Sequence, residues 1–114
     1  MDGFDPTILV ERLEGDQELF TKIMGLFLDD VPKQMGALEE ALDMGDVEKV
    51  QHQAHTLKGS AGHVGATSMQ DVVREIEKVA QQGNLEELRV LVPQLEQEFE
   101  RIKSSLRDRL PPIG

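Results

Sequence analysis

A histidine and a lysine lie three residues apart in the segment "AHTLKGSAGHVGA", which covers residues 54–66. The imidazole of His55 is a nucleophile, and its reference pKa of about 6.5 keeps it largely neutral at pH 7. A nucleophile that accepts a phosphoryl group needs a nearby cation to offset the charge on the phosphoryl oxygens. Lys58 can supply that cation on a flexible side chain, although an ordinary solvated lysine is the alternative. Residue types and spacing therefore permit phosphoryl transfer through His55.

Glycines interrupt the same segment at Gly59, Gly62 and Gly65, and each interior glycine costs a helix about 1 kcal/mol relative to alanine. At about 100° per residue, Gly59 and Gly62 lie within about 40° of His55, and Lys58 lies within about 60°. A face without side chains beside a nucleophile would let a bulky partner approach closely. The alternative is that the glycines allow two helices to pack closely, and the spacing alone does not separate these interpretations.

The segment belongs to an amphipathic helix whose apolar residues recur every three or four positions. His55 lies about 130° from the middle of this apolar stripe. The imidazole is therefore expected to be exposed or at the edge of a groove. The stripe consists of Val47, Val50, Ala54, Leu57, Ala61 and Val64.

Three further segments show the same periodicity, and no stretch alternates with the period of two that marks a strand. The first is a helix at about residues 16–44, and the other two have apolar residues from Met69 to Ala80 and from Leu85 to Leu106. Pro32 and Pro93 lie inside two of these helices and are expected to bend them. Capping patterns mark the predicted ends, namely Gly15-Asp16, Gly45-Asp46, Thr67 with Gln70, and Asn84 with Glu87.

The short connections between these helices favour antiparallel neighbours. Asp5 before Pro6 indicates a further short helix over residues 6–14. The prediction is an all-α fold, an antiparallel up-down four-helix bundle with a short extra N-terminal helix. It forms a single domain over residues 1–114 with a frayed tail at about 108–114.

Composition limits the partners and the chemistry. The 114 residues carry a formal net charge of −10, which disfavours nucleic acid and anionic membranes because both would be repelled. The absence of cysteine excludes disulfides and thiolate metal sites. No apolar run is long enough to cross a bilayer, and no signal sequence is evident. We expect a soluble, monomeric protein of the reducing cytoplasm.

The segment around His55 resembles the signature of histidine-containing phosphotransfer (HPt) domains, and "AGHVG" also resembles the phosphotransfer domain of chemotaxis histidine kinases. The resemblance covers nearly the whole chain and implies a four-helix bundle with the histidine on a helix face. It implies a phosphocarrier, which accepts a phosphoryl group from a receiver aspartate or a kinase domain and passes it to a receiver aspartate. The matching positions are His55, Leu57, Lys58, Gly59, Val64 and Gly65.

The resemblance also implies roles for particular residues. The lysine at position 58 would steady the phosphoryl oxygens, and the glycine at position 59 would give the partner room. In the chemotaxis relatives a glutamate on the next helix hydrogen-bonds the histidine, and the matching position is Glu77. Glu77 would orient the imidazole and stabilise positive charge on it. The alternative is an exposed ion pair of Glu77 with Lys78 or Arg74.

Residues around the nucleophile are expected to contact the partner, which would be a response-regulator receiver domain, a sensor histidine kinase, or both. His63 lies about 80° from His55 on the helical wheel, although an ordinary surface histidine is the alternative. The expected contact residues are Gln51, His52, Gly59, Gly62 and His63.

Nothing in the chain resembles a nucleotide-binding loop or an enzyme triad, so neither autokinase activity nor a conventional enzyme is expected. No cofactor or metal is expected here, and Mg²⁺ would be held by the receiver. Two alternatives stay open. One is a docking module that binds a receiver or kinase without carrying phosphate. The other is a metal bundle, which is disfavoured because His52, His55 and His63 share one helix, whereas such sites draw ligands from facing helices.

Overall fold

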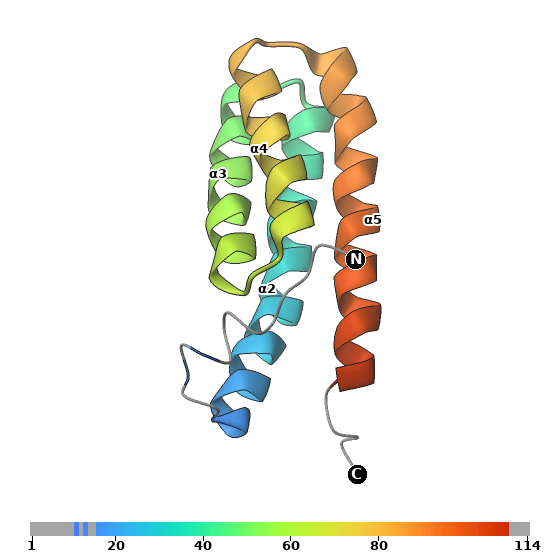
Figure 1. Cartoon of the computed structure of the whole chain (residues 1–114). Coiled ribbons are helices and arrows are strands. Elements are labelled where there is room, and N and C mark those ends of the chain that lie inside the picture. The colour runs from blue at the N-terminus through green and yellow to red at the C-terminus, as the bar shows by residue number, and fades with distance from the viewer. Residues whose placement is uncertain (1–10, 12, 14–15, 110–114) are drawn as a thin grey trace.

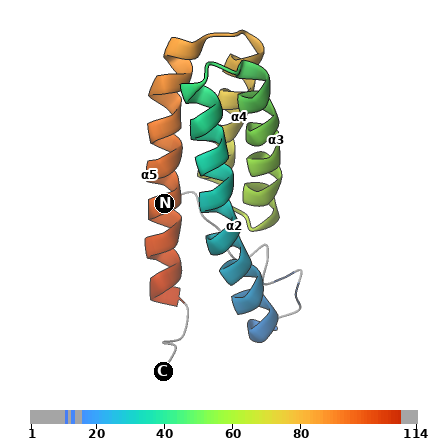
Figure 2. The ribbon, with the colours of Figure 1, turned by 180° about the vertical axis from the view of Figure 1, so that it is seen from behind.

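The computed structural model describes residues 11, 13 and 16–109. Its four long helices are α2 (Gln17–Asp43), α3 (Val47–His63), α4 (Thr67–Gln81) and α5 (Leu85–Arg109). They lie side by side with alternating direction, and α2 and α5 extend beyond the shorter α3 and α4 (Figures 1 and 2). The predicted all-α, antiparallel four-helix bundle is therefore confirmed.

The ends of the chain limit two of the predictions. The predicted helix over residues 6–14 lies outside the described residues except for Glu11 and Leu13. Helix α5 continues to Arg109, so the first two residues of the predicted tail are helical, and residues 110–114 lie outside the described part.

Side-chain caps start three of the four helices. Asp16, Asp46 and Asn84 each accept a hydrogen bond from the backbone N–H three residues later, at 3.0–3.2 Å. These bonds satisfy N–H groups that have no partner within the helix. Pro32 and Pro93 lie inside α2 and α5, which continue on both sides of each proline. The bends expected at the two prolines stay a prediction.

The predicted cap of α4 is wrong. Its N-cap is Ala66, which makes no side-chain cap, and Thr67 is already the first helical residue. The side chain of Gln70, expected to complete a capping box, donates instead to the backbone carbonyl of Lys58 on α3, at 3.3 Å. A contact between helices has therefore replaced the local cap.

The buried core fixes the rotation of α3 about its axis. Four residues of its apolar stripe, Val50, Ala54, Leu57 and Ala61, are fully buried. Because this side of the helix faces inward, the residues opposite it, including His55, must face outward. No described helix is long and apolar enough to cross a membrane. The largest fully buried side chains come from all four helices and include Met24, Leu38, Leu57, Met69, Ile76, Leu88, Leu95 and Leu106.

Candidate functional site

His55 projects from the outer face of α3, and 70% of its side chain is exposed. This agrees with the exposure predicted from the helical wheel. Its Nδ1 atom lies 3.0 Å from Oε2 of Glu77 on α4. In a neutral ring, the nitrogen that faces a carboxylate carries the hydrogen, and the other nitrogen keeps its lone pair. The geometry therefore favours Nε2 of His55 as the nucleophilic atom.

Glu77 uses its two oxygens on two different partners. Oε2 faces His55, and Oε1 accepts a hydrogen bond of 2.8 Å from Nζ of Lys58. The hydrogen bond from Lys58, with a smaller contribution from His55, lowers the pKa of Glu77 below its ordinary value, although partial burial opposes the shift. Glu77 is therefore an ionised acceptor at neutral pH.

The three side chains form one hydrogen-bonded group, the His55–Glu77–Lys58 cluster. The exposed fraction falls from 70% for His55 to 27% for Lys58 and 16% for Glu77. The reactive imidazole is thus accessible, while the carboxylate that holds it is largely enclosed. The alternative of an exposed ion pair of Glu77 with Lys78 or Arg74 is wrong, because Glu77 is largely enclosed and pairs with Lys58 and His55, while Arg74 lies 4.0 Å from Asp71.

The three glycines of the motif have different surroundings. A Cβ atom at Gly59 would meet nothing within 4 Å, so this position beside His55 is open. A Cβ atom at Gly62 would meet the side-chain amide of Gln70, which crosses from α4 to α3. Gly65 has a φ of +76° in the turn after α3, where glycine is favoured. Close helix packing therefore accounts for Gly62, whereas Gly59 leaves open space beside His55.

The remaining predicted contact residues lie on the same side of α3. Gln51 is partly buried, and His52 and His63 are exposed. His52, His55 and His63 form no metal site with one another: within the described residues, no group of three or more histidines, cysteines or carboxylates could hold a metal ion. Contact of Gln51, His52 and His63 with a partner stays a prediction.

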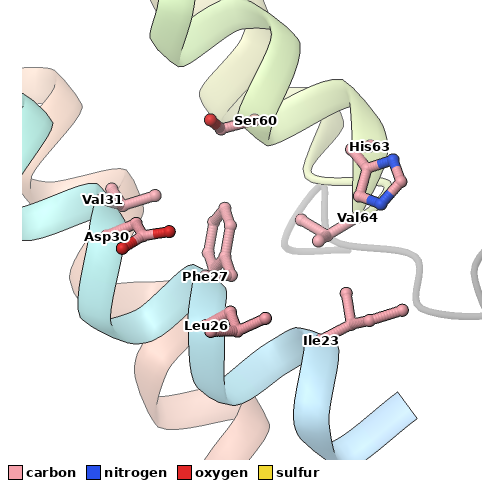
Figure 3. A pocket seen from close by; sticks show the side chains of 8 residues that line it. All are labelled: Ile23, Leu26, Phe27, Asp30, Val31, Ser60, His63 and Val64. Carbon is pink, nitrogen blue, oxygen red and sulfur yellow. The ribbon is translucent and has the colours of Figure 1, made fainter. Parts of the chain in front are cut away.

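A pocket of about 200 Å³ lies between α2 and the end of α3. Side chains of α2 face Ser60, His63 and Val64 across it (Figure 3). Leu26 lines it and is 54% exposed, so it presents apolar surface to solvent beside the pocket. The sequence reasoning missed this pocket, although Leu26 lies off the buried stripe of α2 and could have signalled it. The α2 residues that line it are Ile23, Leu26, Phe27, Asp30 and Val31.

Comparisons with known proteins match most of this chain. A family model described as "Hpt domain" matches residues 22–105. The phosphorelay intermediate protein rdeA of Dictyostelium discoideum is 25% identical over 105 residues, which cover 92% of this chain and 41% of that protein. Histidine-containing phosphotransfer protein 5 of Arabidopsis thaliana is 28% identical over 98 residues, which cover 83% of this chain and 62% of that protein. The chain thus spans less than two thirds of the length of these relatives.

Solved structures show the same fold. The crystal structure of histidine-containing phosphotransfer protein B from Pseudomonas aeruginosa superposes with a TM-score of 0.85 at 26% identity, covering 96% of this chain and 97% of that one. The HPT domain of a sensor hybrid histidine kinase from Shewanella has a TM-score of 0.78 at 19% identity, covering 96% and 94% of the two chains, and shows the fold alone.

Proposed function

Because this chain belongs to the Hpt domain family, we propose that it is a histidine phosphocarrier of a phosphorelay. His55 accepts a phosphoryl group from an aspartyl phosphate of a receiver domain, or from a kinase domain, and passes it to a receiver aspartate. The observation that carries the proposal is the exposed imidazole whose Nδ1 is held by Glu77, which in turn holds Lys58.

The cluster supports a simple transfer step. The lone pair of Nε2 attacks the phosphorus, the bond between phosphorus and the donor aspartate breaks, and the aspartate leaves as a carboxylate. The ring then carries positive charge, and its Nδ1–H still donates to Glu77. Because the pKa of Glu77 is lowered, the proton stays on the ring and the carboxylate stabilises the charge. In the onward step the acceptor carboxylate attacks, the P–N bond breaks and neutral imidazole leaves.

Lys58 supplies positive charge beside the reacting atoms. Its Nζ atom lies 2.8 Å from Glu77 and the side chain is 27% exposed, so the ammonium group can turn from the carboxylate toward a phosphoryl oxygen. Acid–base and metal chemistry are assigned to the partner. Mg²⁺ would be bound by the carboxylates of the receiver, and no cofactor is proposed for this chain.

The partner is proposed to dock across α2 and α3. A standard interface buries about 800 Å² on each partner, a patch of about 16 Å radius. His63 lies eight residues after His55, about 12 Å along α3, so the pocket at Leu26 falls inside such a footprint. The α2 side offers apolar surface at Leu26, whereas the α4 side presents exposed charges at Asp71 and Arg74. A receiver that covers the pocket would also contact His52 and pass over the open position at Gly59.

The chain is further proposed to act as a monomer in the cytoplasm and not to bind nucleic acid. The net charge of −10 supports the last point because a nucleic acid would be repelled.

The test is a phosphotransfer assay read by intact mass. The wild type and the His55→Gln variant are each mixed with a panel of phosphorylated receiver domains, and separately with phosphoramidate as a small-molecule donor. The expected result is one acid-labile phosphoryl group on the wild type and none on His55→Gln. If the wild type binds a receiver but gains no phosphoryl group from any donor, the chain is a docking module and the proposal fails.

A further inference from the structure

The His55–Glu77–Lys58 cluster leaves a phosphorylated histidine short of positive charge. A phosphoryl group carries about −1.5 to −2 charges near neutral pH. Glu77 adds one negative charge, since its pKa is lowered, while the protonated ring and Lys58 each add one positive charge, so the phosphorylated site keeps a net charge of about −0.5 to −1. The whole chain is also acidic, with a net charge of −10. A receiver can supply cations while it is bound, but a carrier between two encounters has only its own.

Few cations are placed to fill this gap. Helices α3 and α4 carry four lysines and arginines, Lys49, Lys58, Arg74 and Lys78. Lys49 lies six residues before His55, near the start of α3, and contacts Asp46 at 4.0 Å. Lys78 lies about 100° round α4 from Glu77, and Arg74 only about 60°. Arg74 is therefore the cation to consider beside Lys58.

The register of the two helices places Arg74 near His55. On α4, Gln70 reaches the Lys58 carbonyl and Glu77 reaches both His55 and Lys58. Arg74 lies four residues after Gln70 and three before Glu77, on the same side of α4. It is therefore level with the turn of α3 that contains Lys58, about 5 Å along the axis from His55.

The surface beside His55 is open at Gly59, where no atom lies within 4 Å of the place that a Cβ would take. Arg74 is 60% exposed, and its contact with Asp71 is 4.0 Å long between two exposed groups. Such a pair contributes little. A guanidinium can also donate two parallel hydrogen bonds to a phosphoryl group, which a lysine cannot.

We propose that Arg74 is a second phosphoryl-binding residue, which leaves Asp71 when His55 is phosphorylated and donates to the phosphoryl oxygens. This proposal rests on the function proposed above. Arg74 stabilises the phosphorylated carrier between encounters, in addition to Lys58. Its effect belongs to the phosphorylated state and not to the folding of the bundle.

The test compares Arg74→Gln with Arg89→Gln, a matched change of an exposed arginine on α5. Each variant is equilibrated with a phosphorylated receiver, and the fraction of phosphorylated His55 is measured by intact mass. Arg74→Gln is expected to lower the equilibrium constant for phosphorylation about fivefold, the effect of a partly exposed charge pair, and Arg89→Gln to leave it unchanged. Arg74→Lys should restore part of the loss, and the difference from wild type should shrink at 1 M salt.

The outcomes separate the two proposals. If the wild type is phosphorylated and Arg74→Gln equals Arg89→Gln in this equilibrium, the role of Arg74 is wrong and the phosphocarrier function stands. A loss in Arg74→Gln that salt does not reduce, together with a lowered melting temperature, would mark a structural role and also overturn the proposal. If the wild type accepts no phosphoryl group from receiver or phosphoramidate, both proposals fail.

Discussion

Replacing Glu77 with glutamine removes the negative charge of the cluster and keeps the shape of the side chain. The amide oxygen of glutamine can accept from His55 or from Lys58, but its NH₂ group would then face the other donor. The substitution therefore weakens both the 3.0 Å contact to His55 and the 2.8 Å contact to Lys58. The loss matters most in the transfer step, because the ring gains positive charge as the N–P bond forms.

The magnitude follows from the exposure of the partners. A hydrogen bond to a charged group contributes about 1.5–3 kcal/mol when it is protected from water. Glu77 is 16% exposed but His55 is 70% exposed, so screening reduces the value to about 1 kcal/mol. At 1.36 kcal/mol per factor of ten in rate, the expected loss is about fivefold.

Rapid-quench kinetics at saturating phosphorylated receiver would measure this loss, because saturation separates the transfer rate from binding. Glu75→Gln, an exposed neighbour on the same helix, is the control for the change in net charge. A transfer rate for Glu77→Gln equal to that of Glu75→Gln would show that the carboxylate does not orient or stabilise the imidazole, despite its contact in the structure.

Three further outcomes are expected. Gly59→Ala should raise the free energy of unfolding by about 0.5–1 kcal/mol in urea denaturation, because alanine favours helix and the site is open. The same variant should transfer the phosphoryl group from a receiver more slowly. A lowered free energy of unfolding would contradict this prediction. Leu26→Lys should reduce the rate of transfer from a receiver about fivefold, because the apolar surface that the partner would bury is lost, while labelling by phosphoramidate should stay unchanged. The control is Val90→Lys, at an exposed apolar residue of α5. Equal transfer rates of the two variants would argue against docking across α2 and α3. A hydrogen bond with Glu96, followed by burial and by repulsion from nearby carboxylates, raises the pKa of Glu39 from 4.5 to about 7. The contribution of Glu39 to stability is therefore present below pH 4.5 and lost as pH rises to about 7, so the melting temperature of the wild type should fall over this range relative to that of Glu39→Gln. Parallel curves of melting temperature against pH for the two proteins would refute the hydrogen bond between Glu39 and Glu96.

The four helices could be predicted because burial acts on each helix separately. The apolar stripe of α3 identifies its inward side without knowledge of the other helices, and the exposure of His55 follows from that stripe alone. The caps at Asp16 and Asp46 are equally local, since each acts on a backbone group three residues away. Features that depend on one helix at a time were therefore within reach of the sequence.

Features that depend on the register between helices could not be predicted from the sequence. The sequence predicts a capping box of Thr67 and Gln70 at the start of α4, but the side chain of Gln70 donates instead to the backbone carbonyl of Lys58 on another helix. Glu77 follows the buried Ile76 on α4, but only the register between the two helices brings its carboxylate level with His55. For Glu77 the family resemblance supplied the contact that periodicity could not.

The glycines show how one short motif serves both kinds of feature. Gly59 and Gly62 have similar angular positions beside His55, so the sequence could not assign them different roles. At Gly62 the missing side chain admits the amide of Gln70, and the resulting bond between α4 and α3 sets the level at which Glu77 meets the imidazole. Gly65 turns the chain so that α4 can run back along α3. Two glycines therefore help to place the carboxylate beside His55, and Gly59 leaves the surface next to the imidazole open.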